Sequence, residues 1–125
     1  MGAILTDLGR AIVTGRMLGL GTEPRNIGWG TGEGTPDKAD AALFSEASEA
    51  RVAGSSSRAS IDATNDTYRV IGTLECSGAA KRITNVGIFD DAGNLYIKSA
   101  FPGVPLEVGD KIQFTFNHQF AQEAD

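Results

Sequence analysis

The clearest alternation of apolar and polar residues lies near the end of the chain. Between residues 111 and 120 every second residue is aliphatic, aromatic or the single histidine, and the residues between them are polar. A period of two places these sets on opposite faces of a β-strand. The segment therefore predicts a strand with one packed and one solvated face, and its packed face carries Ile112, Phe114, Phe116, His118 and Phe120.

Other runs also have β-strand character. Residues 68–76 alternate in the same way, and residues 83–89 are rich in β-prone side chains. Residues 90–94, Asp-Asp-Ala-Gly-Asn, are turn formers that lead directly into the apolar run 95–98. The last two runs therefore predict a β-hairpin.

Weaker signals surround these runs. Residues 25–30 form a short strand-like run, and the period changes to two from Arg51 onward. Here Val52 and Ala53 lead into residues 54–57, which we interpret as a polar turn before a second run that begins near Ala59. Residues 102–105, Pro-Gly-Val-Pro, predict a break in the β structure.

Helical periodicity is confined to the first part of the chain. Apolar residues between Gly2 and Gly19 recur at steps of three and four, which predicts one amphipathic helix within residues 1–20. Each internal glycine costs a helix about 1 kcal/mol relative to alanine, so packing or a partner must hold this one. Thr35 and Pro36 are typical of a helix start and predict a short second helix ending at Ala41 or Leu43.

These elements predict a mainly β fold with a minor α+β character. We expect an antiparallel β-sandwich or barrel-like domain with one N-terminal helix and one short helix. The 125 residues fit a single domain, and 16 glycines favour many turns and short strands. The expected order is the helix (1–20), a glycine-rich loop with the short helix (25–50), an antiparallel β region (51–120) and a tail (121–125).

Charge and composition exclude several classes of function. The formal net charge of −5 argues against binding the phosphates of nucleic acids. One cysteine cannot form an internal disulfide, and no apolar run approaches the length of about 18 residues that a membrane span needs. We therefore expect no nucleic-acid partner, no membrane partner and no signal peptide.

The glycine-spaced segment 28–34 invites comparison with a phosphate-binding loop. It lacks the Lys and Ser or Thr of a nucleotide-binding loop after Gly34, and no frame fits the dinucleotide spacing. Glu33 and Asp37 would also repel a phosphate. We interpret the segment as a structural loop and predict no cofactor.

Side chains with catalytic chemistry are sparse. His118 is the only histidine, and its place on the apolar face of a strand is typical of a core or interface histidine. A dyad of Cys76 and His118 is conceivable, but the sequence supplies neither an oxyanion site nor a third orienting group. We predict no catalytic residues and no enzyme activity.

Two groups of carboxylates and amides contain potential Ca²⁺ ligands. Neither matches the ligand spacing of an EF-hand, and Asp, Asn and Gly are also the ordinary residues of turns. We therefore favour turns over metal sites, and predict no metal, for Asp90, Asp91 and Asn94 and for Asp62, Asn65 and Asp66.

Trp29 lies between two glycines and is either a core residue or an anchor at a protein interface; its chemistry leaves both alternatives open. Arg10 and Arg16 lie in the first predicted helix, where they form a solvated face or pair with an acidic partner. A sugar-binding module is a further alternative, suggested by Trp29 and the turn carboxylates.

Three segments together resemble small structural proteins of tailed bacteriophages. They are Ile27-Gly28-Trp29-Gly30-Thr31-Gly32, Val86-Gly87-Ile88-Phe89-Asp90 before the predicted hairpin, and the Phe-rich final strand. The resemblance runs from the N-terminal helix to the last strand. It implies a non-enzymatic virion component, mostly β, that is assembled in the host cytoplasm and binds neighbouring copies and other virion proteins.

Related sequences are often labelled tail-fibre-like. A fibre needs a shaft or a receptor-binding tip, whereas this sequence stops five residues after Phe120, so we expect a head-decoration (cement) protein. The alternative is a tail-fibre, baseplate or neck component. On this hypothesis the chain is a homo-oligomer bound to the major capsid protein; Trp29 and Phe44 are interface anchors, and Arg10 and Arg16 pair with shell carboxylates.

Overall fold

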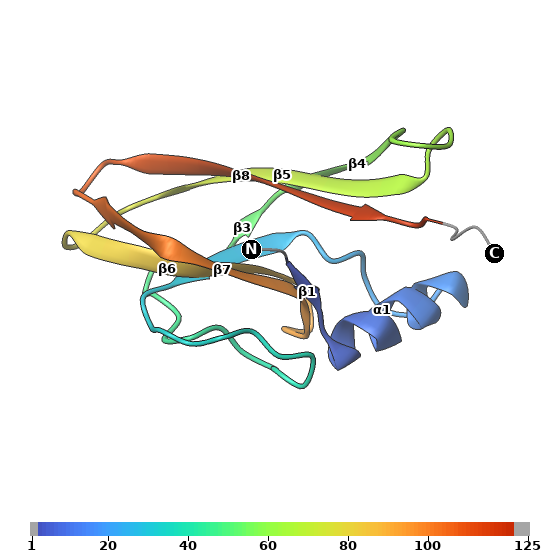
Figure 1. Cartoon of the computed structure of the whole chain (residues 1–125), viewed down its shortest axis with the longest axis horizontal. Coiled ribbons are helices and arrows are strands. Elements are labelled where there is room, and N and C mark those ends of the chain that lie inside the picture. Colours follow the sequence, from blue (N-terminus) through green and yellow to red (C-terminus); the bar gives the residue numbers. More distant parts are fainter. Residues whose placement is uncertain (1–2, 122–125) are drawn as a thin grey trace.

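Two antiparallel sheets face each other in the computed structural model, which describes residues 3–121 (Figure 1). The larger sheet has the order β1-β7-β6-β2-β3, and the smaller one has the order β4-β5-β8. The predicted antiparallel β-sandwich with an N-terminal helix is confirmed. The elements are β1 (Ile4–Leu5), α1 (Asp7–Met17), β2 (Asn26–Gly30), β3 (Val52–Ala53), β4 (Ser55–Ala59), β5 (Thr67–Glu75), β6 (Lys81–Phe89), β7 (Leu95–Leu106) and β8 (Lys111–Gln119).

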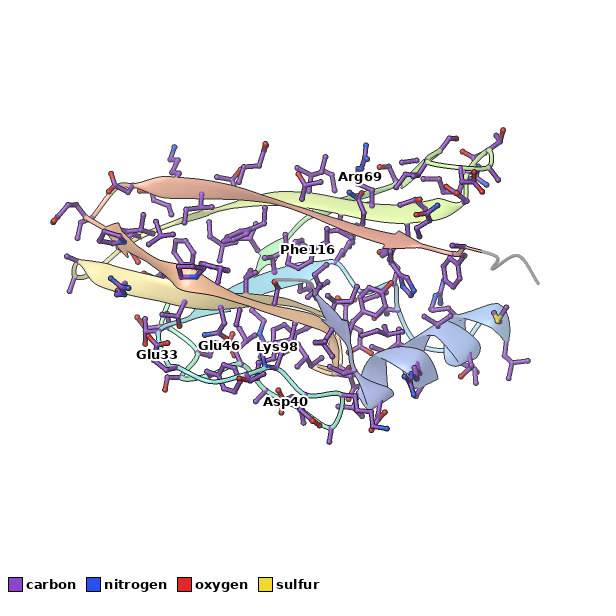
Figure 2. All side chains as sticks on the ribbon, in the orientation of Figure 1. Glu33, Asp40, Glu46, Arg69, Lys98 and Phe116 are labelled. Carbon is purple, nitrogen blue, oxygen red and sulfur yellow. The ribbon has the colours of Figure 1, made fainter. Side chains whose placement is uncertain are left out.

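The predicted alternation in β5 and β8 is confirmed by their pairing. Val70 lies opposite Phe116, and both are buried. Figure 2 shows Phe116 between the two sheets and Arg69 on the outer side of the smaller sheet. Arg69 donates a hydrogen bond there to the side chain of Asn117 at 2.8 Å. The period of two therefore separates a packed face from a wet face.

The core lies between the sheets and draws on both. Trp29 from β2 meets Phe114 from β8 edge to face, with ring centroids 6.3 Å apart. Aromatic pairs favour this arrangement because the edge of one ring is positive and the face of the other is negative. The buried members of this core are Ile27, Trp29, Val70, Leu74, Cys76, Ile83, Val86, Ile88, Tyr96, Ile97, Leu106 and Phe116.

The predicted β6–β7 hairpin is also confirmed, but the predicted break at residues 102–105 is wrong. β7 continues through these residues to Leu106. β1 pairs with β7 only at Ile97 and Lys98, so Pro102 and Pro105 lie where β7 is paired with β6 alone. The missing N–H groups of the prolines therefore break no ladder on the other side of β7. A register shift between Ile83 and Asn85 of β6 absorbs the extra residues of β7 as a bulge.

The predicted polar turn at residues 54–57 is wrong as well. Ser55 to Ala59 form β4, an edge strand paired with β5. The turn lies between β4 and β5, where the Asp66 carboxylate accepts hydrogen bonds from the N–H groups of Ile61, Asp62 and Ala63. The serines and the arginine of β4 suit an exposed edge strand. Because β4 buries few side chains, its sequence shows little alternation of apolar and polar residues.

The first helix is shorter than predicted. Ile4 and Leu5 pair with β7 in β1, and α1 begins only after Thr6. The Thr6 hydroxyl accepts a hydrogen bond from the N–H of Gly9 at 2.9 Å and donates one to the carbonyl of Leu95 at 2.6 Å. This buried threonine thus caps the helix and fixes its start to the sheet.

The predicted second helix is wrong, because residues 31–51 form an irregular loop. Figure 1 shows this covering loop across the outer face of the five-stranded sheet. The Asn85 side chain accepts a hydrogen bond from the N–H of Phe44 and donates one to its carbonyl, at 3.0 and 3.1 Å. The Lys38 carbonyl accepts the N–H of Asp7 at 2.7 Å. Neighbouring elements therefore use the backbone groups that a helix would pair internally.

The glycine run is explained by close packing under the covering loop. A Cβ on Gly30 would lie 2.4 Å from the carbonyl oxygen of Phe44, and one on Gly34 would lie 2.7 Å from its ring. Both distances are too short for a side chain to be accommodated without movement. The glycines thus allow Phe44 to approach β2 and the loop that follows it, which supports the interpretation of a structural loop.

Candidate functional site

An apolar groove opens between α1 and the ends of the two sheets. Its volume is about 540 Å³. One wall is the inner side of the helix, and the other carries rings from β5, β7 and the end of β8. The segment between α1 and β2 adds Glu23 and Pro24 to the walls formed by Ile12, Val13, Arg16, Met17, Tyr68, Tyr96 and Phe120.

The groove exists because the inner side of α1 gradually leaves the sheet. Gly9 is buried against the carbonyl of Tyr96, whereas Val13, one turn later, is only half-buried. Met17, a further turn along, is 82% exposed. Figure 1 shows the helix running away from the five-stranded sheet beneath the end of β8. Among the residues that the structure describes, no layer therefore covers the second half of this amphipathic helix.

Two large apolar residues of the groove and two that follow the end of the helix are exposed, and we call these four residues the helix-end patch. Met17 and Phe120 lie on opposite walls of the groove, and Leu18 and Leu20 follow the last turn of the helix. Leu18 is 78% exposed, Leu20 60% and Phe120 58%. Single exposed apolar residues are normal in soluble proteins, but a cluster beside an apolar hollow is typical of a binding surface.

The polar groups inside the groove are paired. The Tyr68 hydroxyl donates a hydrogen bond to the carbonyl of Pro24 at 2.7 Å, and burial, with a smaller effect of Glu23, raises the pKa of Tyr68 to about 12. The Tyr96 hydroxyl is hydrogen-bonded to Nδ1 of His118. Burial lowers the pKa of His118 below its ordinary value, so the ring is neutral at pH 7. Of the residues lining the groove, this leaves Arg16 and Glu23 as its ionised side chains.

His118 therefore lies where the sequence suggested, among aromatic side chains, and its ring stacks on Phe120 with centroids 4.5 Å apart. The Cys76–His118 dyad is ruled out by the register of β5 and β8. His118 pairs with Tyr68, eight residues before Cys76 along β5, which corresponds to about 26 Å of extended chain. Cys76 is buried, with its Sγ 3.3 Å from the carbonyl of Ala79.

In both candidate Ca²⁺ clusters the carboxylates accept hydrogen bonds that stabilise turns. Hydrogen bonds from the N–H groups of Ala63 and Ile61 keep the pKa of Asp66 well below its ordinary value. Asp90 closes the β6–β7 turn by accepting the N–H of Asn94 at 2.8 Å, and Asp91 accepts a hydrogen bond from Asn26. Within residues 3–121, no three His, Cys, Asp or Glu side chains gather in a way that would hold a metal ion.

Trp29 is fully buried, so of its two alternatives the structure supports the core residue. Its indole N–H donates a hydrogen bond to Glu49 at 3.0 Å. Glu49 also accepts hydrogen bonds from Lys81 and from the N–H of Ser77. Since no part of the ring reaches the surface, we correct its assignment as an interface anchor.

Phe44 is half-buried and holds the covering loop in place. The Lys98 ammonium lies 3.3 Å from the centroid of its ring and donates hydrogen bonds to Asp40 at 3.0 Å and to the carbonyl of Ala42 at 2.8 Å. Figure 2 shows Lys98 between the five-stranded sheet and the loop, and Asp40 on the loop. A lysine that is only 1% exposed needs such partners. The ring of Phe44 thus has an internal role.

The two arginines that were predicted at the interface, Arg10 and Arg16, have different surroundings. Arg10 is exposed and lies 3.7 Å from Asp7, one turn away on the helix. Arg16 lines the groove and donates a hydrogen bond at 2.8 Å to the carbonyl of Gly21, in the segment that follows α1. Of the four predicted interface residues only Arg16 belongs to the candidate site. Sequence analysis missed Met17 and Leu20, although an apolar cluster around a helix end is a visible signal.

We expect the stability of the protein to fall in acid because of Glu49. Burial opposes its ionisation, but hydrogen bonds from Lys81, Ser77 and Trp29 outweigh this and lower its pKa from 4.5 to about 2. Because the folded-state pKa lies below the unfolded one, the contribution of ionised Glu49 is complete above about pH 5 and is lost towards about pH 2. Urea midpoints of Glu49→Gln should be lower at neutral pH and depend less on pH.

Glu75→Gln is the matched control, because Glu75 is exposed and lies 3.9 Å from Lys111. We expect it to follow the wild-type pH profile, since exposed pairs contribute little. Parallel profiles for wild type and Glu49→Gln would contradict the role of Glu49.

No helix within residues 3–121 has the length and apolar character needed to cross a membrane. No protein-family model, curated protein or solved structure matches the chain.

Proposed function

We propose that the protein is a non-enzymatic structural component of a tailed-bacteriophage virion, acting as a head-decoration protein that binds and stabilises the assembled head. The observation that carries the proposal is the helix-end patch beside its groove. It offers apolar area for contact, whereas the reactive side chains of His118 and Cys76 are far apart and engaged internally.

Two of the segments that carry the resemblance to phage structural proteins lie side by side in the fold. Residues 27–30 of the first belong to β2, and residues 86–89 of the second belong to β6. Ile27 pairs with Ile88, and Trp29 pairs with Val86. The two segments, far apart in the sequence, thus form one unit at the centre of the fold.

A decoration role also suits the physical character of this surface. Attachment to a symmetric shell repeats one contact many times, so a modest apolar area in each copy adds up to strong overall binding. A protein that binds the assembled state and not the separate subunits stabilises that assembly by mass action. The stabilisation is mechanical and requires no reactive centre.

Copy number in particles tests the proposal. An antibody raised against the purified chain is used to probe phage particles isolated on a density gradient from the source culture. We expect the chain to co-sediment with heads, in many copies relative to the major capsid protein, because a shell repeats its binding site over the whole surface. Quantitative gels or mass spectrometry give the ratio.

A tail-fibre, baseplate or neck component would instead be present in a few copies and would remain with tails when heads and tails are separated. That result would replace the decoration role with the tail alternative. Absence of the chain from intact particles would overturn the virion proposal as a whole.

A further inference from the structure

We infer that the groove and the helix-end patch form a self-complementary surface, on which a second copy of this chain docks about a two-fold axis. The inference rests on the proposed function and names the partner of the patch as a neighbouring copy of the chain, whose binding can be measured without a particle. In a two-fold contact the same surface serves both partners, so each copy must offer both a hollow and a projection.

This surface has both features side by side. The hollow is the apolar groove of about 540 Å³, and the projection is the end of α1 with Met17, Leu18 and Leu20. The helix end extends away from the five-stranded sheet, and no other element within residues 3–121 covers it (Figure 1). Antiparallel packing of two such helix ends would place the projection of each copy against the hollow of the other.

The exposed apolar area fits a weak, reversible pair. With about 150–200 Å² for each large apolar side chain, the helix-end patch exposes on the order of 500 Å². Two copies together would therefore bury on the order of 1,000 Å², which is near the lower limit for a specific interface. A small ligand in the groove would leave Leu18 and Leu20 in water, since neither residue lines the groove. The distribution of apolar surface therefore favours a protein partner.

Charge favours a second copy over an unlike partner. The chain carries a net charge of −5, so two copies repel each other over most of their surface. The groove, however, holds one basic and one acidic residue, Arg16 and Glu23, which form no ion pair with each other. A two-fold axis lets Arg16 of each copy face Glu23 of the other, so that this surface is neutral and complementary to itself.

Sedimentation equilibrium of the purified full chain over a wide concentration range is the first test. We expect a reversible monomer–dimer equilibrium, and we expect Leu18→Lys to raise the dissociation constant by about tenfold or more. Leu18 is 78% exposed, so the fold should tolerate the change, as circular dichroism and urea midpoints can check. Val108→Lys is the matched control: Val108 is 60% exposed and lies in the β7–β8 turn, away from the groove.

A charge exchange tests the orientation. Glu23→Arg places like charges opposite each other and should weaken the dimer, whereas the double variant with Arg16→Glu should restore affinity towards that of the wild type. A wild-type chain that stays monomeric at all concentrations would overturn the inference. So would a dimer that Leu18→Lys leaves intact, a double variant no tighter than Glu23→Arg, or an assembly larger than a dimer.

Discussion

Gly9→Ala is expected to destabilise the protein by about 2–3 kcal/mol, whereas Gly15→Ala in the same helix is expected to stabilise it by up to about 1 kcal/mol. Alanine favours a helix over glycine at both positions, so intrinsic propensity predicts a gain in both cases. The difference between the two variants therefore measures the contact between α1 and the sheet.

The reason lies in the surroundings of the two residues. A Cβ on Gly9 would lie 2.2 Å from the backbone carbonyl oxygen of Tyr96 in β7, a contact that requires movement of the helix or the strand. A Cβ on Gly15 would meet nothing closer than 3.9 Å. Gly9 allows the helix to approach the strand closely, while Gly15 has no such role.

Urea unfolding of the two variants and the wild type gives the measurement. Because moving α1 changes one wall of the groove, Gly9→Ala should also weaken the inferred dimer, and Gly15→Ala should leave it intact. Equal gains in stability for both variants would contradict the close approach of α1 to β7.

Predictions from local patterns succeeded where one period governs an element. In β8 the alternation from Ile112 to Phe116 follows from one packed and one solvated face, which the sequence records directly. The β6–β7 turn is likewise local, because Asp90 and Asn94 close it with their own backbone and side chains. The structure of such elements can therefore be predicted from their own residues.

Predictions failed where distant residues decide the structure. Thr35 and Pro36 are good helix-starting residues, but the N–H of Asp7 and the ammonium of Lys98 bind the carbonyls of Lys38 and Ala42, which a helix would pair internally. Residues 54–57 have the composition of a polar turn, but Ser55 to Ala59 pair with β5 and form β4. Local propensity contributes tenths of a kcal/mol for each residue, and tertiary hydrogen bonds readily outweigh it.

The candidate site was only partly visible for the same reason. The sequence shows apolar residues near the end of α1, but it does not show that the helix leaves the sheet after Gly9. It leaves the role of Trp29 undecided, because a core ring and an interface anchor have the same chemistry. Exposure separates them: Trp29 is buried, and Leu18 is on the surface.

Trp29→Ala is expected to lower the free energy of unfolding by about 3–5 kcal/mol. The change empties the space that the indole fills against Phe114 and removes the N–H that binds Glu49. Domains of this size are stable by only about 5–15 kcal/mol, so the variant is expected to be partly unfolded at growth temperature. Urea midpoints, with near-ultraviolet circular dichroism as the readout of packing, give the measurement.

Trp29→Phe is the control, because it keeps an aromatic ring and removes the hydrogen bond to Glu49. We expect it to cost about 1–3 kcal/mol, as the loss of a donor to a buried charged acceptor does. A Trp29→Ala variant as stable as the wild type would contradict the core role. Loss of particle binding by Trp29→Ala would report unfolding, whereas the same loss by a stably folded Leu18→Lys would report the surface. Comparison of the two variants therefore separates a residue that stabilises the fold from a residue of the binding surface.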